Sequence, residues 1–317
     1  MTDIEKIEYY VDKAAGEPGF ELGLTRRQMR KAFSTIALAL CLGLLVSQLL
    51  IPGLLVIIVP EMDIKAHTFL VGGLCTALFT LPAAILLTTG LSRQQPEKNE
   101  LTAGRFFALV AICYACMILG NIVGIGVNYL LSPDSVDLIG KLATASGASP
   151  AEMIIAFVIL APVFEEMVFR KVLVDRVLPY GEWPAILFSG ITFGLFHGNL
   201  AQFFYAALLG MVLAYVYIRT GRILYTIGIH ACINFLGGVV PLLIPSASSL
   251  FLLVALAGIV LFFVLRKDIR VSKDAVPGVG VAMFGNVGMI LFLIITGLLM
   301  SYVAYIMNHP ELTQGLI

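Results

Sequence analysis

Apolar residues gather in long runs along the chain, and short polar or charged stretches separate these runs. A helix needs about 20 residues, with a range near 17–25, to cross the hydrocarbon core of a bilayer, so runs of this length predict transmembrane helices. The runs cover residues 32–59, 67–91, 106–132, 150–178, 183–199, 202–218, 222–240, 248–266 and 279–307. The pattern predicts an all-α polytopic membrane protein with about nine transmembrane helices.

The positions of Lys and Arg predict the orientation, because cytoplasmic loops of membrane proteins carry an excess of basic residues. With a cytoplasmic N-terminus, every Lys and Arg except Lys65 and Lys141 falls in an inner segment or at an inner helix end. This alternation requires that the short fifth and sixth runs, which meet near Gly198-Asn199, both cross as a hairpin and do not form a re-entrant segment. The predicted topology has a cytoplasmic N-terminus and an external C-terminus.

The same runs predict how the chain is organised. We expect a cytoplasmic N-terminal arm over 1–31, three accessory transmembrane helices and an external loop over 32–149, a four-helix core over 150–240, and two C-terminal transmembrane helices and a tail over 241–317. The core begins at Ser149-Pro150-Ala-Glu152, which is typical of a helix N-terminus with a capping box.

Composition agrees with this class. Hydrophobic residues make up 59% of the chain and charged residues 13%, which is outside the range of an ordinary soluble domain. Acidic and basic residues are equal in number, so no basic excess indicates nucleic acid as a partner. The five cysteines lie in apolar stretches, and Cys113-Tyr-Ala-Cys116 lacks a thioredoxin-like setting, so we expect no disulfide. We also expect no signal peptide, because the first apolar run is too long for one.

Ionisable residues inside the apolar runs are the candidate chemistry. Such a residue costs about 2.5–3.5 kcal/mol on insertion scales, so it indicates a functional site. Three groups occur, on the fourth, fifth and seventh runs: Glu165-Glu166-x-x-x-Arg170, Phe193-x-x-x-His197 and His230-x-x-x-Asn234. Two histidines on otherwise apolar helices favour acid–base chemistry over a structural ion pair with a spare glutamate. His67 and His309 lie at helix ends and receive no role.

Helix geometry predicts how the first group is arranged. Glu166 and Arg170 are spaced i,i+4 and can pair, whereas Glu165 points about 100° away on the helix and is free to face another group. Pro162 is expected to loosen the helix and free a backbone carbonyl near the site.

A stripe of small residues on the fifth run, Gly190, Gly194 and Gly198, allows close helix packing. We expect this packing to bring His197 near the fourth helix.

The three groups, taken in order, resemble the motifs of the CPBP family, which contains CAAX prenyl endopeptidases and bacterial Abi homologues. Ala161-Pro162 before the glutamates and Arg219-Thr-Gly221 before the last motif resemble it too. The resemblance covers about residues 150–240. Lys171 departs from the pattern, since bacterial members often have glycine there, but the motif's chemistry does not depend on it.

The resemblance implies an intramembrane endopeptidase in a cell membrane, with the bacterial cytoplasmic membrane as the expected location. It implies that Glu165 and His197 activate the hydrolytic water, that His230 and Asn234 stabilise the oxyanion, and that Glu166 and Arg170 hold the architecture. The expected partners are the lipid bilayer and a peptide or membrane-protein substrate.

A zinc site made of Glu165, His197 and His230 is an alternative to a metal-free reaction. The chain has no His-Glu-x-x-His sequence, so we favour the metal-free reaction. Two other functions stay open from the sequence. One is a non-catalytic scaffold or bacteriocin-immunity protein on the same fold, and the other is a proton-coupled transporter. The complete set of costly ionisable residues argues against the scaffold, and the absence of inverted repeats argues against the transporter.

Overall fold

The computed structural model describes residues 18–59, 67–131, 148–244, 246 and 248–309. In this part of the chain all regular secondary structure is helical, and the one β-type pairing is an isolated bridge between Gly181 and Ala275. The predicted all-α class is therefore confirmed. The predicted external loop, with Lys141, lies almost wholly outside the described residues, as do Lys65 and much of the predicted N-terminal arm.

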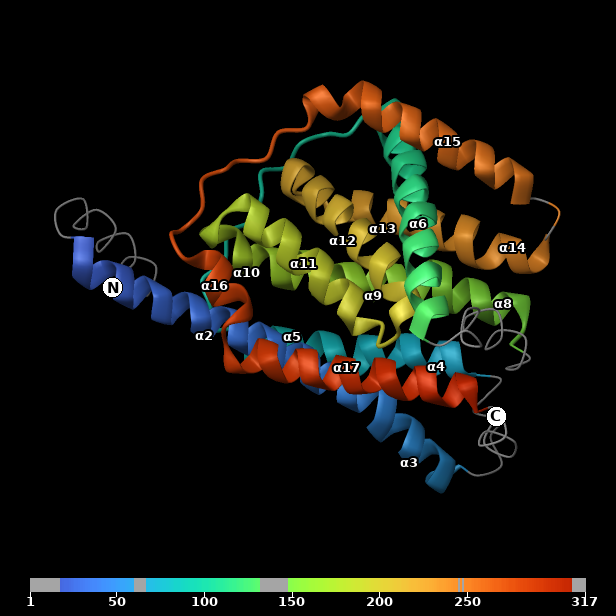
Figure 1. Ribbon diagram of the computed structural model, residues 1–317, viewed down its shortest axis with the longest axis horizontal. Coiled ribbons are helices and arrows are strands. Elements are labelled where there is room, and N and C mark those ends of the chain that lie inside the picture. Colours follow the sequence, from blue (N-terminus) through green and yellow to red (C-terminus); the bar gives the residue numbers. More distant parts are fainter. Residues whose placement is uncertain (1–17, 60–66, 132–147, 245, 247, 310–317) are drawn as a thin grey trace.

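The predicted apolar runs are mainly helical where the structure describes them, but the last run is divided at Gly285-Asn286 into two helices (Figure 1). The α-helices are α2 (Pro18–Leu45), α3 (Ile51–Ile58), α4 (Thr68–Cys75), α5 (Leu81–Leu87), α6 (Ala103–Leu131), α8 (Pro150–Met153), α9 (Ala161–Glu166), α10 (Asp175–Val177), α11 (Glu182–Phe196), α12 (Leu200–Thr220), α13 (Ile223–Asn234), α14 (Val240–Leu243), α15 (Ser248–Leu265), α16 (Val279–Phe284) and α17 (Val287–Asn308). Wider π-helical turns continue several of them: η1 (Val46–Leu50), η2 (Thr76–Thr80), η4 (Ile154–Leu160), η5 (Met167–Val174) and η7 (Phe235–Val239).

Several of these helical stretches could cross a membrane. Among the described residues, six are long and apolar enough: Arg26–Leu55, Phe69–Leu87, Ala103–Leu130, Leu200–Thr220, Leu250–Asp268 and Val287–Ile306. Glu182–Phe196 and Ile223–Val239 are apolar but shorter. The fourth stretch, α8 to α10, is continuous and long, but it carries the charged residues of the site. A multi-pass membrane protein is confirmed, whereas the count of nine spans and the sides of the two termini stay predictions.

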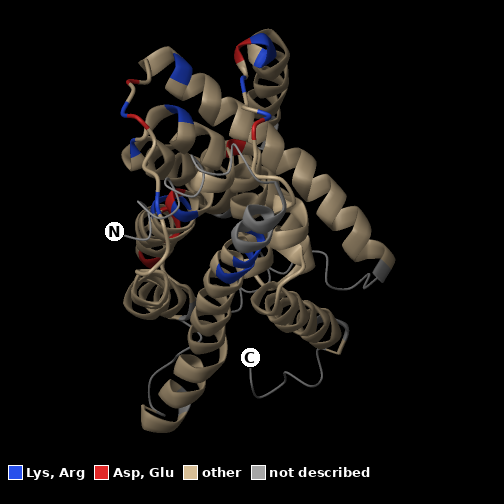
Figure 2. Cartoon of the chain, turned by 90° about the vertical axis from the view of Figure 1, so that its left-hand side faces the viewer, with Lys and Arg blue, Asp and Glu red and all other residues tan. Residues whose placement is uncertain are grey.

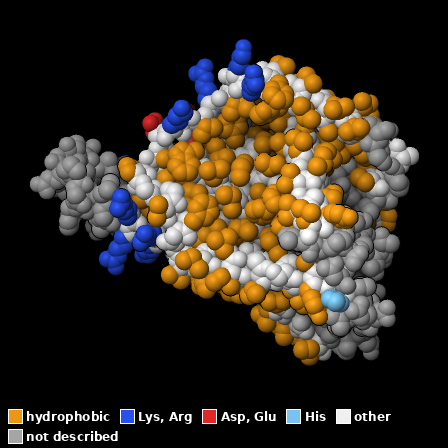
Figure 3. Space-filling view, in the orientation of Figure 1, with side chains coloured by type: hydrophobic (Ala, Val, Ile, Leu, Met, Phe, Trp, Pro, Cys, Tyr) orange, Lys and Arg blue, Asp and Glu red, His pale blue; other side chains and the backbone are white. Residues whose placement is uncertain are grey.

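The surface is that of a protein surrounded by lipid. Large apolar side chains are exposed on α3, α6, α15 and α17. Figure 3 shows them as a broad apolar face, with Lys and Arg confined to its left and upper edge. Figure 2 views the molecule from that left-hand side and shows charged residues on only a few short segments of the ribbon. An apolar surface of this extent indicates membrane contact.

The helices surround a central group that carries the three motifs. In Figure 1, α2 and α17 run side by side along the lower edge, and α15 covers the upper edge against α6. The α2–α17 contact is close, because a side chain at Gly288 would lie 2.1 Å from the Ser34 carbonyl oxygen. Helices α9, α11, α12 and α13 lie between these edges. The site residues therefore belong to the interior of the bundle.

The predicted capping box at the start of the core is confirmed. The Ser149 hydroxyl accepts the backbone N–H of Glu152 at 3.3 Å, and the Glu152 carboxylate accepts the backbone N–H of Ser149 at 3.0 Å. Glu152 also binds His67 at 2.5 Å, which joins the second helical stretch to the fourth. His67, which received no role from the sequence, thus has a structural contact.

The close packing predicted for the small-residue stripe is present, but Gly190 and Gly194 face α12 and not the fourth helix, while Gly198 lies against Leu299 of α17. A side chain at Gly190 would lie 2.8 Å from the carbonyl oxygen of Ala207, and one at Gly194 would lie 2.6 Å from that of Phe203. Consecutive helices joined by a short turn pack against each other, and here the glycines allow their backbones to touch. The fourth helix meets α11 through larger side chains, with the Phe169 ring 5.0 Å from that of Phe193.

Candidate active site

The predicted pair of Glu166 and Arg170 is present and fully buried. Arg170 Nη1 lies 3.1 Å from Glu166 Oε1, and neither side chain has any exposed area. Arg170 Nη2 also donates to the backbone carbonyl of Gly210 on α12, at 3.2 Å. The guanidinium lies over the ring of Phe193, 4.7 Å from its centroid, which adds a cation–π contact. Arg170 thus connects the fourth helix to α11 and α12.

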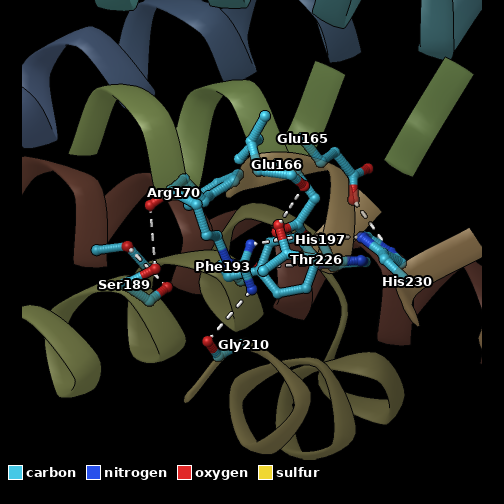
Figure 4. Close-up of polar contacts among 12 residues, drawn as sticks. Glu165, Glu166, Arg170, Ser189, Phe193, His197, Gly210, Thr226 and His230 are labelled. Atoms are coloured by element: carbon cyan, nitrogen blue, oxygen red, sulfur yellow. Dashed lines mark hydrogen bonds and ion pairs between the residues drawn. The ribbon is translucent and has the colours of Figure 1, made fainter. Parts of the chain in front are cut away.

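His230 of α13 contacts both glutamates of the fourth helix (Figure 4). Its Nδ1 lies 2.9 Å from Glu166 Oε1, and its Nε2 lies 3.8 Å from Glu165 Oε2. Because a carboxylate only accepts, the Nδ1 position carries the hydrogen. The Thr226 hydroxyl, one turn earlier on α13, also lies next to Glu166. The first and third motifs therefore meet, with Glu166 shared between Arg170 and His230.

His197 ends α11 in a defined tautomer. Its Nδ1 lies 2.8 Å from the backbone carbonyl oxygen of Phe193, so Nδ1 carries the hydrogen and Nε2 is the acceptor in the neutral ring. Phe193 separates the two histidines, with its ring centroid 4.9 Å from His197 and 5.7 Å from His230. Glu165 is close enough to His197 to act on it electrostatically. The second motif thus joins the other two.

Asn234 occupies a position that the sequence did not predict. Its Nδ2 donates to the backbone carbonyl oxygen of Phe157, at 2.8 Å. One of its two amide hydrogens is therefore used inside the protein, and the amide carries one further hydrogen. The freed carbonyl expected from Pro162 exists, but Asn234 binds it.

Several buried polar atoms of the pair are incompletely satisfied. Glu166 Oε2 and Arg170 Nε have no hydrogen-bond partner within the described residues, and Arg170 Nη1 is near Glu166 without hydrogen-bond alignment. Buried charges without full hydrogen bonding are costly, and such clusters occur at functional sites. By contrast, the Glu165 side chain is 17% exposed. Glu165 is therefore the carboxylate of the pair that can meet water.

The arrangement does not fit the zinc set considered from the sequence. Within the residues described, no three His, Cys, Asp or Glu side chains are grouped so that they could hold a metal ion. Spacing alone argues against zinc, because each histidine still presents Nε2 while Nδ1 binds Glu166 or a backbone carbonyl, and zinc-ligating histidines have the same arrangement. We therefore derive no step through a metal, and metal dependence is a matter for experiment.

The comparisons with known proteins agree with the motifs. Residues 147–236 match the family described as "Type II CAAX prenyl endopeptidase Rce1-like". By this match, residues 147–236 resemble that family. The resemblance to CPBP proteases stated from the three motifs is confirmed for this segment, and the matched residues contain every residue of the site.

One curated relative matches part of the chain. It is the Bacillus subtilis (strain 168) protein named "Putative membrane peptidase YdiL", 32% identical over 83 residues, which are 26% of this chain. The match spans 34% of that protein, so the chain covers about a third of the relative's length. No solved structure matches the chain.

The sequence analysis gave no role in the site to two residues that contact it, although the sequence held a signal for one of them. Phe193 opens the second motif, and its ring contacts Arg170 and both histidines. Gly210 gives only a backbone carbonyl to Arg170. No side-chain pattern could reveal it, because any residue carries that group.

Proposed function

We propose that this protein is an intramembrane endopeptidase that hydrolyses a peptide bond in a membrane-associated peptide or protein. The observation that carries the proposal is the contact of His230 with both Glu165 and Glu166. Carboxylate and imidazole groups that meet in a mostly buried place are suited to general acid–base hydrolysis. The Rce1-like resemblance of the same segment supports peptide hydrolysis as the reaction.

In this proposal, Glu165 and His197 activate water. Glu165 is partly exposed and is not paired with Arg170, so its carboxylate can accept a hydrogen from water. His197 offers Nε2 as a second acceptor, because Nδ1 is held by Phe193. The water oxygen attacks the scissile carbonyl carbon while its proton passes to one of these groups. The tetrahedral intermediate then collapses, and the same proton goes to the leaving amine.

His230 and Asn234 stabilise the oxyanion. With Nδ1 held by Glu166, a protonated His230 can donate from Nε2, and Asn234 has a second amide hydrogen. Removing one such donor typically costs about 2.7–4 kcal/mol of transition-state stabilisation. Glu166 and Arg170 do not touch the substrate. They hold His230 in the orientation that this role requires.

The test is hydrolysis of membrane-associated peptides by the purified protein in proteoliposomes. Glu165→Gln, His197→Ala and His230→Ala should each abolish hydrolysis and still yield a folded, inserted protein. Glu100→Gln is the matched control, because Glu100 is exposed and lies outside the site, with Arg222 as its ion-pair partner. Turnover by Glu165→Gln close to that of the unchanged protein would refute the mechanism. A chain inactive on every peptide would favour the non-catalytic scaffold.

A further inference from the structure

A second polar chain leads from His197 into α12, and it consists of Asn199, Gln202 and Tyr205. Asn199 caps α12, since its Oδ1 accepts the backbone N–H of Gln202 at 2.8 Å. This bond identifies Oδ1 as the amide oxygen, so the Nδ2 group must donate. Nδ2 donates to the backbone carbonyl of His197 at 3.2 Å and to Gln202 Oε1.

These hydrogen bonds determine which group donates in the bond between Gln202 and Tyr205. Because Gln202 Oε1 accepts from Asn199, the Nε2 group of Gln202 faces Tyr205 and donates to its phenol oxygen at 2.7 Å. The phenol oxygen is an acceptor in this bond, so its own hydrogen points elsewhere. No side chain or carbonyl of the described residues accepts that hydrogen. Tyr205 therefore presents an oriented donor without a protein partner.

This donor lies beside the candidate active site. The Tyr205 ring centroid is 6.4 Å from that of His197, and the Glu165 carboxylate is close enough to act on the phenol electrostatically. Helix α6 fixes the backbone behind the ring, because a side chain at Gly120 would lie 2.3 Å from the Tyr205 Cα. Position and direction of the hydroxyl are thus both set by the protein, as preorganised catalytic donors require.

We propose that Tyr205 is a catalytic residue that donates a hydrogen bond to the oxygen on which negative charge develops in the tetrahedral intermediate. This inference rests on the endopeptidase function proposed above. No proton leaves the phenol; the hydroxyl only strengthens an existing hydrogen bond as the charge forms. Asn199 and Gln202 are positioning residues, because they act through Tyr205.

The first test is Tyr205→Phe, which keeps the ring and removes the donor. Its kcat, measured at a temperature where the variant is folded, should fall about 10²–10³-fold, the usual effect of losing one such donor, while KM stays unchanged. Tyr215→Phe is the matched control, because Tyr215 is on the same helix and its ring faces Arg219; it should keep full activity. An unchanged kcat for Tyr205→Phe would overturn the proposal, as would an equal loss of kcat in Tyr215→Phe.

The second test reverses the hydrogen bond. In Gln202→Glu the new carboxylate can only accept, so the phenol hydrogen turns toward it and away from the site. Its kcat should fall as in Tyr205→Phe, and the two changes together should cost little more than either one. Fully additive losses would overturn the orienting role of Gln202. If the unchanged protein cleaves no peptide, the endopeptidase function fails and this proposal with it; an active protein with an unaffected Tyr205→Phe variant refutes this proposal alone.

Discussion

The side-chain amide of Asn234 donates to the backbone carbonyl of Phe157 at 2.8 Å, across 77 positions of the chain. The reason lies in the π-helical turn before the glutamates. The backbone N–H of Ala161 bonds to Ala156, and Pro162 has no N–H, so neither residue donates to the Phe157 carbonyl. The Asn234 side-chain amide donates to this carbonyl instead. The proline of the first motif and the asparagine of the third are therefore parts of one contact.

This contact predicts a compensation between two variants. Asn234→Ala should lower the free energy of unfolding by about 1–3 kcal/mol, because the buried carbonyl loses its donor. Pro162→Ala supplies a backbone N–H at that place, so the double variant should recover part of the loss. Hydrolysis by the double variant should stay about 10²–10³-fold slower, because the oxyanion donor is still missing. Unfolding in detergent measures the first effect and peptide turnover the second. Equal stability losses with and without Pro162→Ala would contradict the shared contact.

The buried pair predicts a second compensation. Arg170→Met leaves the buried Glu166 charged and without the guanidinium that neutralises it, which should cost about 3–5 kcal/mol. Arg170→Met combined with Glu166→Gln removes both charges and should be destabilised less than the single variant. Thermal unfolding in detergent measures the difference. Equal destabilisation by the single and the double change would mean that water solvates the pair.

The sequence predicted those parts of the site that depend on neighbouring turns of one helix. The capping box of Ser149 and Glu152 and the i,i+4 pair of Glu166 and Arg170 follow from local spacing alone. The contact of His230 with Glu166 does not, because it depends on how α13 is rotated and how deeply it lies beside the fourth helix. The family resemblance implied that these helices contribute to one site, but not which nitrogen meets which carboxylate.

A polar cluster outside the site tests whether loss of activity is specific to the residues of the site. Tyr217 donates to Asp175 Oδ1 at 2.8 Å, and Lys171 lies 3.1 Å from Oδ2 of the same carboxylate. Asp175 and Tyr217 are buried, so Tyr217→Phe should lower the free energy of unfolding by about 1–3 kcal/mol through the lost donor. Its kcat should be unchanged at a temperature where the variant is folded. A kcat loss as large as that of Tyr205→Phe would show that this cluster takes part in the reaction.

Metal dependence is tested by chelation. If Glu165, His197 and His230 act on water without zinc, a chelator should leave hydrolysis intact and the purified protein should hold metal well below one ion per chain. A zinc site would instead give about one bound ion per chain, because structural and catalytic zinc sites bind tightly at neutral pH. His197→Ala and His230→Ala would then lose the ion together with activity. Elemental analysis and turnover of the same samples distinguish the two cases.

The predicted topology is tested by labelling introduced cysteines in intact cells with a membrane-impermeant maleimide. Cys116 and Cys232, the two native cysteines that are not fully buried, are first replaced by alanine to lower the background. Asp137→Cys lies in the predicted external loop and should be labelled in intact cells. Lys267→Cys lies in a predicted inner segment and should be labelled only after the membrane is opened. The predicted side of each position depends on the number of spans that precede it. Labelling of Lys267→Cys in intact cells would therefore show that the predicted orientation, or the predicted number of spans before Lys267, is wrong.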